Sequence, residues 1–370
     1  MANNNDKKVL NVPALRFPEF TGEWEKCKLS KVCSFFSGGT PPSSNKEYYN
    51  GNIPFIRSGE LHNDETELFI TKEGLDNSAA KMVEVGDLLL ALYGATSGDI
   101  AISKIKGAIN QAILCIRTKQ NKKFVESVWN KHVARLLQTY LQGGQGNLSA
   151  DIVKNIPFYF TNIEEQNKLA RFISLLDQRI AAQNKIIEKL QSLIKGITIL
   201  LTTKGKPNAT IAQCLECHSS TLQESEVSHS GLYKVFGANG LIGYTDMPQM
   251  KGDAILIIKD GSGVGTASYA QGEFSVIGTL NYLTAINNYD LRYLYFVLSV
   301  FNFQSYKTGM AIPHIYFKDY GNAKIYCPPL SEQKRIANVL GKLESKLCLE
   351  QNILASFNLQ KRYLLGRMFI

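Results

Sequence analysis

The stretch Glu165-Gln-Asn-Lys-Leu-Ala-Arg-Phe-Ile173 recurs as Glu332-Gln-Lys-Arg-Ile-Ala-Asn-Val-Leu340, at an offset of 167 residues (332 − 165). A second pair keeps nearly the same offset, since Gly86-Asp-Leu-Leu-Leu-Ala-Leu-Tyr-Gly94 recurs as Gly252-Asp-Ala-Ile-Leu-Ile-Ile-Lys-Asp-Gly261. A third, looser pair joins Gly144–Leu148 with Gly309–Ile312. Chance does not readily place three matches in one order at one offset, so the sequence predicts two copies of one unit.

A long amphipathic pattern includes each copy of the first string. Its apolar residues recur in alternating steps of four and three, the 3.5-residue period of a coiled-coil seam. The first predicted seam comprises Leu169, Ile173, Leu176, Ile180, Gln183, Ile187, Leu190 and Ile194. The second comprises Ile336, Leu340, Leu343, Leu347, Glu350, Leu354 and Phe357. The first pattern continues through Ile197 and Leu201 and the second through Leu364 and Met368, so each covers about 33 residues, or roughly 50 Å of helix. Two such helices in one chain are expected to pair with each other.

Polar residues interrupt both seams at equivalent places. Gln183 and Glu350 are separated by the repeat offset (350 − 183 = 167), and a polar residue at an inner position commonly fixes register at some cost in stability. The helix starts are also visible. Thr161 and Asn162 can cap the first helix, and Ser331 is the expected cap of the second.

The regions before the helices contain both strand and helix patterns. The apolar runs 87–93 and 254–258 predict buried strands, and 124–141 and 291–303 predict helices packed on a sheet. The expected fold class is therefore α+β, with two globular domains in a pseudo-symmetric tandem repeat and two long helices. We expect a first domain at 1–160, a first helix at 161–206, a second domain at 207–330 and a second helix at 331–370.

Composition limits the class of protein. The chain has 370 residues, 44% hydrophobic and 20% charged, which is typical of a globular protein. No apolar run reaches the ~18–20 residues of a membrane helix, and the start lacks a signal core. Seven cysteines without a regular framework favour reduced thiols in a cytoplasm. The net charge of +9 is compatible with an acidic partner such as nucleic acid, although a basic protein need not bind one.

The excess of positive charge is uneven. Residues 1–160 carry net +3, 161–206 net +4, 207–330 net −2 and 331–370 net +4. Most of the excess therefore lies on the predicted helices. We expect these helices to attract DNA or an acidic partner surface, while specificity depends on nearly neutral loops.

Several short motifs suggest chemistry that their context does not support. Cys214-Leu-Glu-Cys217-His218 has the C-x-x-C-H pattern of covalent haem attachment, but it occurs where the first copy has an ordinary strand-like stretch. A zinc site lacks a second ligand pair with suitable spacing. Gly261-Ser-Gly-Val-Gly265 lacks the spacing of a dinucleotide loop, and no Walker A string is present. A tight turn whose amides can meet a DNA phosphate is the better interpretation.

Catalytic residues are not apparent either. Asn52-Ile-Pro-Phe55 and Asn155-Ile-Pro-Phe158 faintly resemble the N-P-P-F string of amino-methyltransferases, but Ile replaces the first Pro and no glycine-rich partner motif accompanies them. Both are expected to be strand starts with Pro as the first residue. We therefore predict no catalytic residue, no metal site and no cofactor bound by this chain.

Polar turns that occur in both copies remain as candidates for DNA contact. Arg, Lys, Asn, Gln and Ser side chains contact base edges and phosphates, and aromatic residues are interleaved with them here. Each turn alone is more often a plain solvated turn; the argument depends on equivalent turns in two copies. The candidate residues are Thr40, Lys46, Tyr48, Arg57, Ser58, Tyr93, Thr96, Ser97, Asn147, Lys234, Asn239, Lys259, Ser262, Lys307, His314 and Tyr316.

The chain resembles the specificity subunits of type I restriction-modification systems. The resemblance rests on Pro13–Phe20 followed by Trp24, Ser37-Gly-Gly-Thr-Pro41, Gly51–Leu61, Gly86–Leu90, Gly107–Ala112 and Pro328–Gln333, in this order over essentially the whole chain. The second domain is shorter and lacks the Ser-Gly-Gly-Thr-Pro string, and the first helix lacks the preceding Pro-Pro-Leu.

The resemblance implies two target recognition domains held apart by an antiparallel coiled coil. Each domain would read one half of an asymmetric bipartite double-stranded DNA target, and the helices would dock modification (methyltransferase) subunits, expected to be two. S-adenosylmethionine, ATP and Mg²⁺ would then belong to partner subunits, including restriction subunits in the full complex. Two alternatives stay open: a stand-alone DNA methyltransferase or nuclease, and a coiled-coil adaptor without a role on DNA.

Overall fold

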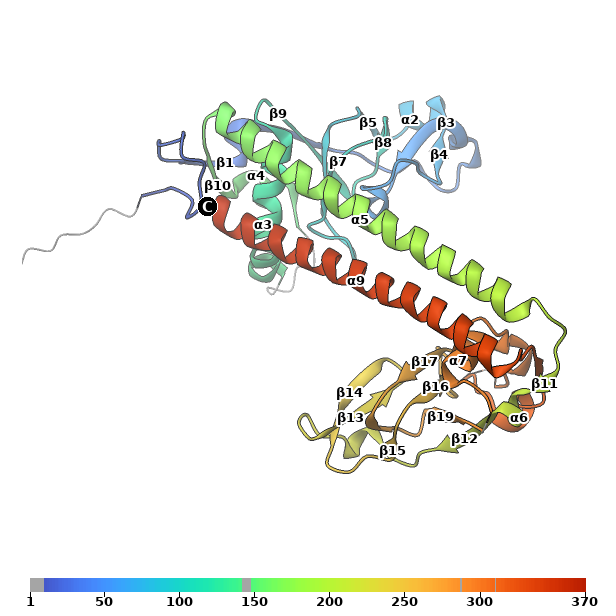
Figure 1. Cartoon of the computed structure of the whole chain (residues 1–370). Helices are drawn as coiled ribbons and strands as arrows, with labels where there is room; N and C mark the ends of the chain where they lie inside the picture. The colour runs from blue at the N-terminus through green and yellow to red at the C-terminus, as the bar shows by residue number, and fades with distance from the viewer. Residues whose placement is uncertain (1–9, 142–147, 287, 310) are drawn as a thin grey trace, which may run out of the picture. The chain divides into compact units, whose positions relative to one another are not determined.

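The computed structural model describes residues 10–141, 148–286, 288–309 and 311–370 (Figure 1). The chain forms two compact units. Unit 1 comprises Met1–Ala182 and Leu354–Ile370, and unit 2 comprises Gln183–Ile353. Two long helices, α5 (Ile163–Thr203) and α9 (Leu330–Met368), each contribute residues to both units. No helix in the described part of the chain is long and apolar enough to cross a membrane.

The globular part of unit 1 contains two four-stranded sheets. The first has the order β2 (Cys33–Ser37), β9 (Ile113–Thr118), β6 (Leu88–Ala91), β7 (Ile100–Ile102), and every pairing in it is antiparallel. The second has the order β4 (Phe69–Ile70), β3 (Tyr49–Ile56), β8 (Gly107–Ile109), β5 (Lys81–Val83), in which β3 and β8 are parallel.

The globular part of unit 2 repeats this topology. One sheet has the order β12 (Leu215–Ser219), β19 (Leu280–Ala285), β16 (Ala254–Ile258), β17 (Ala267–Ala270), again antiparallel throughout. The other has the order β14 (Gly240–Thr245), β13 (Tyr233–Gly237), β18 (Glu273–Val276), β15 (Met250–Lys251), and β13 and β18 are again the parallel pair. The same strand order in both units confirms the tandem repeat and the α+β class predicted from the sequence.

Smaller elements complete the two domains. Unit 1 also contains the strands β1 (Glu25–Lys28) and β10 (Pro157–Phe160), which pair antiparallel, and the helices α1 (Leu29–Val32), η1 (Lys46–Tyr48), η2 (Ser58–Glu60), α2 (Lys72–Asp76), α3 (Lys122–Leu141) and α4 (Ala150–Asn155). Unit 2 also contains the antiparallel pair β11 (Ala209–Thr210) and β20 (Lys324–Ile325), and the helices α6 (Ile211–Cys214), η3 (Glu224–Glu226), α7 (Leu291–Ser299), η4 (Phe303–Tyr306) and α8 (Phe317–Tyr320).

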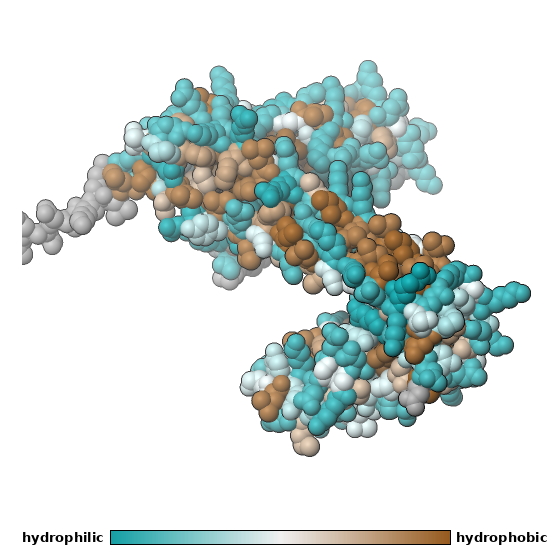
Figure 2. All heavy atoms as spheres, in the orientation of Figure 1, coloured by the Kyte–Doolittle hydropathy of each residue, from teal (hydrophilic) through white to brown (hydrophobic). Residues whose placement is uncertain are grey.

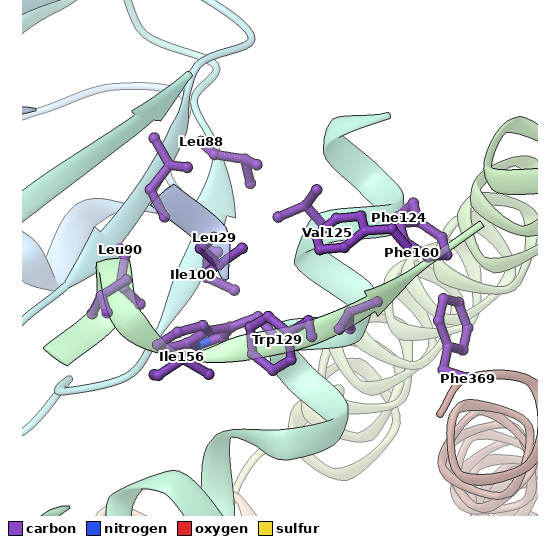
Figure 3. Close-up of a cluster of buried hydrophobic side chains, with 14 of the residues drawn as sticks. Leu29, Leu88, Leu90, Ile100, Phe124, Val125, Trp129, Ile156, Phe160 and Phe369 are labelled. Atoms are coloured by element: carbon purple, nitrogen blue, oxygen red, sulfur yellow. The ribbon is translucent and has the colours of Figure 1, made fainter. Parts of the chain in front are cut away.

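The core of unit 1 draws on the strands, on α3 and on both long helices. Leu88 and Leu90 of β6 are buried with Trp129 of α3, and Leu169 and Ile173 of α5 belong to the same cluster. The far end of α9 enters this cluster as well. Figure 3 shows Phe369 beside Phe124 and Phe160, and its ring centroid lies 5.5 Å from that of Phe124 and 6.3 Å from that of Trp24.

The core of unit 2 has the same plan. Ile336, Ala337 and Leu340 from the start of α9 are buried with Ile255 and Ile257 of β16, and the end of α5 packs against them. Each globular domain thus contacts one end of both helices. The boundaries at 160/161, 206/207 and 330/331 stay predictions; α5 extends over Ile163–Thr203, α9 begins at Leu330, and the compact units divide these helices themselves.

The long helices run antiparallel within each unit. In unit 1, Asp177 forms an ion pair with Lys361 at 2.5 Å, and the guanidinium of Arg179 lies 4.5 Å from the Phe357 ring centroid. In unit 2, Gln183 contacts Glu350, and Lys204 contacts Glu332. Residue numbers rise along α5 while those of their partners fall along α9, which is an antiparallel register. All fifteen predicted seam residues are buried or half-buried.

A buried glutamine occupies the same place at the start of each long helix. Gln166 accepts a hydrogen bond from the Asn121 amide, just before α3, and donates one to the Thr161 carbonyl, at 3.1 and 2.7 Å. Gln333 accepts from the Asp290 amide, just before α7, and donates to the Pro328 carbonyl, both at 2.8 Å. This side chain therefore connects the helix of each globular domain to the first turn of the adjoining long helix.

Four local predictions are corrected or refined by the structure. The helix predicted at 291–303 ends at Ser299, because Asn302 caps the separate turn η4 with its side chain. The helix predicted at 124–141 begins at Lys122. Ser331 lies inside the first turn of α9 and is not its cap; the Glu332 and Gln333 amides donate to the Pro329 carbonyl instead.

The fourth concerns the two Ile-Pro-Phe strings. Pro157 is the first residue of β10, as predicted, whereas Pro54 lies inside β3. The register of β3 against β4 is irregular just before it, between Tyr49 and Ile53, so a residue without an amide hydrogen is tolerated there. The first helix cap is as expected, since Asn162 accepts a hydrogen bond from the Glu165 amide at 2.8 Å.

Candidate nucleic-acid interface

A tight turn joins β6 to β7 in unit 1 and carries the candidates Tyr93, Thr96 and Ser97. Gly94 and Gly98 have φ values of 84° and 86°, which favour glycine. The Ser97 amide donates to the Gly94 carbonyl at 3.1 Å, and the Gly98 amide donates to the Ala91 carbonyl at 2.8 Å. The Tyr93 ring packs partly against the core, Thr96 and Ser97 are half-buried as well, and the Ser97 hydroxyl donates to the Leu92 carbonyl at 3.0 Å.

The turn between β16 and β17 in unit 2 has the same backbone. Gly261 and Gly265 have φ values of 99° and 89°. The Val264 amide donates to the Gly261 carbonyl at 3.1 Å, and the Gly265 amide donates to the Ile258 carbonyl at 2.8 Å. Every one of these residues is 167 positions after its counterpart, yet the side chains between the glycines differ: Ala-Thr-Ser in unit 1 and Ser-Gly-Val in unit 2. One scaffold therefore presents two different sets of polar groups.

A second segment supports each turn. In unit 2, the Ile315 amide donates to the Lys259 carbonyl at 3.0 Å, and the Gly261 amide donates to the Pro313 carbonyl at 2.9 Å. Between these bonds, His314 and Asp260 form an isolated antiparallel β-bridge. His314 also pairs with Thr308, which follows Lys307, and its ring lies 5.1 Å from that of Tyr316. The structure thus brings together five candidates that are dispersed in the sequence: Lys259, Ser262, Lys307, His314 and Tyr316.

The corresponding contact exists in unit 1. The Leu148 amide donates to the Leu92 carbonyl at 2.8 Å, which is the counterpart of the bond between Ile315 and Lys259. Asn147 is the counterpart of His314 (314 − 147 = 167), but Asn147 lies outside the described residues. The loose repeat pair at 144–148 and 309–312 is in part outside them for the same reason.

A histidine and a carboxylate flank the turn of unit 1. Nε2 of His62 lies 2.9 and 3.0 Å from the two carboxylate oxygens of Asp99, the residue after Gly98. The hydrogen bond to Asp99 raises the pKa of His62, and partial burial opposes this only in part. In unit 2, Lys259 lies 3.5 Å from Asp260 beside the equivalent turn. Each turn therefore has a carboxylate beside a basic side chain, His62 in unit 1 and Lys259 in unit 2.

The remaining candidates are distributed over other elements. Thr40 donates to Gln111 at 2.6 Å, Lys46 and Tyr48 lie in η1, and Ser58 lies in η2. Arg57 is less available than its sequence suggests, because its Nη2 atom donates to Glu60 at 2.7 Å and to Glu67 at 2.9 Å. In unit 2, Lys234 is exposed on β13 and Asn239 precedes β14 in the hairpin turn. These residues lie on elements other than the two turns, so the structure does not gather all the candidates into one cluster.

The described residues contain no group of three or more His, Cys, Asp or Glu side chains that could hold a metal ion. Cys217 and His218 of the C-x-x-C-H string lie on β12, where the His218 ring stacks on Tyr282 at 4.9 Å and its Nε2 lies 2.9 Å from the Thr284 hydroxyl. Cys214 ends α6 and is buried, with its Sγ 3.7 Å from that of Cys327. These side chains form part of the packing of unit 2.

Two features were not singled out by the sequence reasoning. Gln166 and Gln333 are identical in both copies and buried, and their identity in the repeat was the available signal. A basic cleft beside α3 was also missed. Lys131 and Arg135 are one helical turn apart, which the sequence does indicate, but Lys26 joins them only through the pairing of β1 with β10.

Comparison with known proteins agrees with this architecture. The model of the family described as type I restriction modification DNA specificity domain matches residues 21–192 and again 212–358. The chain is 26% identical over 196 residues to the type I restriction enzyme MjaVIII specificity subunit of Methanocaldococcus jannaschii, covering 52% of this chain and 44% of that protein. It is 20% identical over 360 residues to the EcoprrI specificity subunit of Escherichia coli, covering 87% and 88%.

The match to some relatives is partial. The chain spans less than half the length of the MjaVIII subunit and of the MjaIX specificity subunit of the same organism, where the coverage is 42%. Among solved structures, the S subunit of a type I restriction-modification system from M. genitalium has a TM-score of 0.66 at 17% identity, covering 97% of this chain and 99% of that one. A chain from a structural study of complex assembly and conformational transition of the type I R-M system has a TM-score of 0.58 at 15% identity, covering 94% and 97%. With the same sheet order in both units and two family matches that together include most of the sequence, this chain belongs to the type I restriction modification DNA specificity family.

Proposed function

We propose that this chain is the non-catalytic DNA-recognition subunit of a type I restriction-modification complex. Each globular domain reads one half of an asymmetric, bipartite target in double-stranded DNA. The observation that carries this proposal is the pair of turns at 94–98 and 261–265, which share the two hydrogen bonds within each turn and one bond from the supporting segment but differ in the side chains between their glycines. A common scaffold with different polar groups is suited to recognise two different short DNA sequences, here called words.

The chemistry of the complex belongs to partners in this proposal. Modification subunits supply S-adenosylmethionine-dependent methylation of adenine, and restriction subunits supply ATP- and Mg²⁺-dependent cleavage. The chain itself contributes sequence recognition and assembly. The complex acts in the cytoplasm, where the free thiols of this chain stay reduced.

An apolar strip on the unit 2 part of α5 supports docking of a modification subunit. Ile186, Leu193 and Leu200 recur every seven residues, so they lie on one side of the helix, next to the seam. Leu193 and Leu200 are 54% and 66% exposed. Hydrophobic side chains gather over this half of α5 in Figure 2. Val339 of α9 adds a further exposed apolar side chain in the same unit. A row of this kind on a coiled coil is well suited to accept another helix.

The docking proposal has a direct test. Leu193→Asp combined with Leu200→Asp should abolish co-purification with the modification subunit, because it introduces charges into an apolar contact. Leu232→Asp, at a residue 78% exposed on the globular part of unit 2, is the matched control and should keep the partner. If both variants still co-purify with the modification subunit, the α5 strip is not its docking surface.

Methylation mapping tests the recognition function. The chain is co-expressed with its modification subunit and all methylated adenines in the host genome are mapped. We expect two short words separated by a spacer of fixed length. Thr96→Ala should alter or relax the first domain's word alone, and Ser262→Ala the other word alone, since each removes one hydroxyl from one turn. Methylation at one continuous word, or none, counts against the proposal.

The two alternatives give different results. A stand-alone methyltransferase or nuclease would act on DNA as the purified chain with S-adenosylmethionine or Mg²⁺ alone, and such activity would replace the proposal. A coiled-coil adaptor would not bind DNA even with its partners. Phosphate contacts make true DNA binding weaker as salt rises, so the salt dependence of affinity separates these cases.

A further inference from the structure

A basic cleft in unit 1 lies between β1, β10 and the α3 helix, near the last residue of the described chain. Its volume is about 710 Å³, within the range of roughly 300–1,000 Å³ that is common for ligand sites. Its polar lining consists of Lys26, Lys131, His132, Arg135, Thr139 and Tyr159. None of these residues belongs to the recognition turns described above.

The positive side chains of this cleft have no acidic side chain beside them among its described lining residues. Among the described residues that line the cleft there is no Asp or Glu, although three side chains carry a permanent or near-permanent positive charge. Lys131 and Arg135 are four residues apart on α3, so like charges lie on the same face of one helix, which is unfavourable. By contrast, Lys123 of the same helix forms an ion pair with Asp177 at 2.7 Å.

Burial adds to this imbalance. It lowers the pKa of Lys131, and the nearby Arg135 lowers that pKa further. Burial likewise lowers the pKa of His132, against a hydrogen bond to the Ile370 carbonyl that raises it, and the charges of Lys131 and Arg135 lower it again. An anion in the cleft would relieve these effects, because it supplies the missing opposite charge.

Two of the lining side chains are held in place. The Lys131 ammonium donates to the Phe369 carbonyl, and Nε2 of His132 lies 2.9 Å from the Ile370 carbonyl oxygen. The Lys26 ammonium lies 5.7 Å from the Tyr159 ring centroid, a cation–π distance. A site whose side chains are already oriented loses less rotamer freedom when a ligand binds.

The corresponding helix of unit 2 carries less positive charge. The equivalent helix of unit 2, α7, ends at Ser299, and Arg292 in its first turn is its only Lys or Arg. Arg292 is neutralised by Glu344 of α9. The shorter α7 therefore lacks a counterpart of the helix turns that carry Lys131 and Arg135.

We propose that this cleft binds a phosphate group, with Lys26, Lys131 and Arg135 as its cationic ligands. The guanidinium of Arg135 presents a planar pair of donors that matches two phosphate oxygens, and the lysines add point charges. The Thr139 hydroxyl can donate as well, and the volume leaves room for a sugar or base attached to the phosphate. Two sources share this chemistry: a backbone phosphate of the bound DNA, and a free nucleotide or polyphosphate. Only the DNA source rests on the proposed function.

The first arm of the test uses tripolyphosphate and calorimetry on the full-length chain with its partner subunits. Lys26→Gln combined with Arg135→Gln removes two charges from exposed residues and should leave the fold intact. Removing two charge-assisted hydrogen bonds should weaken tripolyphosphate binding at least about tenfold. The control is Lys104→Gln combined with Lys106→Gln, which removes the same charge from exposed residues outside the cleft and should bind like the parent chain. Lys131→Gln is a second cleft variant, read together with its melting temperature because Lys131 also contacts Phe369.

The second arm distinguishes the two sources. If the ligand is a DNA phosphate, the Lys26/Arg135 variant should bind target DNA less tightly, with the methylated word unchanged. The slope of log affinity against log salt should then fall by about 0.9 for each phosphate that the cleft no longer neutralises. An unchanged slope together with weaker tripolyphosphate binding identifies a free phosphate compound. If the cleft variants match the control in both arms, the cleft is not a phosphate site, whether or not the chain directs methylation to a bipartite word.

Discussion

The side-chain amide of Gln183 donates hydrogen bonds to the carboxylate and to the main-chain carbonyl of Glu350, at 2.5 and 3.1 Å, between helices α5 and α9. Both residues interrupt otherwise apolar seams, and they are separated by the repeat offset of 167 residues. Lys346, one turn before Glu350, pairs with the same carboxylate at 2.5 Å. A polar pair of this kind is satisfied in one register of the two helices and unsatisfied in a shifted one, so it favours the observed alignment.

The first prediction concerns this pair. Gln183→Leu or Glu350→Leu alone should lower the melting temperature by about 2–4 °C or more, because each leaves a polar partner without its hydrogen bond. The double change to Leu should recover most of the loss, since it restores a continuous apolar seam. Thermal unfolding of the three variants measures this. A double variant that is as unstable as the sum of the two singles would contradict a coupled pair.

The second prediction concerns acid stability. Burial raises the pKa of Glu60, but hydrogen bonds from Arg57, Thr66 and the Glu67 amide outweigh it and bring the pKa to about 2. The pKa in the folded state thus lies below the ordinary value of 4.5, so the ionised carboxylate stabilises the fold above about pH 4.5. That contribution is lost as the pH falls from about 4.5 toward 2.

Glu60→Gln removes the titrating group and should lower stability at neutral pH by roughly 1–3 kcal/mol, because Arg57 and its neighbours lose a charged acceptor. It should also flatten the decline of stability between pH 5 and pH 3. Denaturant unfolding at several pH values checks both effects. Glu65→Gln, on the exposed loop after η2, is the charge-matched control and should keep the slope of the parent chain.

The third prediction concerns the buried glutamines at the helix starts. Gln166→Leu leaves the Asn121 amide and the Thr161 carbonyl without their partner, and should cost roughly 2–4 kcal/mol of unfolding free energy. Gln333→Leu should have a similar effect in unit 2. Gln178→Leu, at an exposed position of α5, should be nearly neutral. Equal stability of Gln166→Leu and this control would show that the connection between α3 and α5 contributes little.

The fourth prediction concerns the end of α9. Phe369→Ala should destabilise unit 1 by roughly 3–5 kcal/mol, because it opens a cavity between the rings of Trp24 and Phe124. Leu359→Ala, at a residue 60% exposed on the same helix, should change stability by less than about 1 kcal/mol. Hydrogen exchange in the strands of unit 1 gives the measurement. Unchanged protection in Phe369→Ala would show that the core closes without α9.

Much of the fold was accessible from the sequence because it depends on periodicity. The seams around Leu169 and Ile336 repeat every 3.5 residues, and the repeat offset relates two domains that then share one sheet order. The exact ends of individual helices were harder to predict from the sequence. The end of α7 at Ser299 depends on the Asn302 side chain, and the position of Ser331 inside α9 depends on which carbonyl accepts the first amides.

The candidate site could be predicted only in part. The two glycine turns were visible as repeated strings, but their support by Leu148 and Ile315 requires the folded chain. Arg57 looked like a free base-reading residue, yet Glu60 and Glu67, close in sequence, occupy its guanidinium. The basic cleft could not be predicted from the sequence for a related reason, since Lys26 and Arg135 are 109 positions apart (135 − 26) and come together only in the tertiary structure.

The division of unit 1 into two pieces of chain has a consequence for synthesis. Unit 2 is one continuous stretch, so a ribosome completes it before it delivers residues 354–370, on which the core around Trp24 closes. At about 5–20 residues per second, the first domain remains without these residues for roughly 10–40 s after its own sequence has been translated. The domain that is made first is therefore the last to be finished, and during that interval its aromatic core lacks the Phe369 ring.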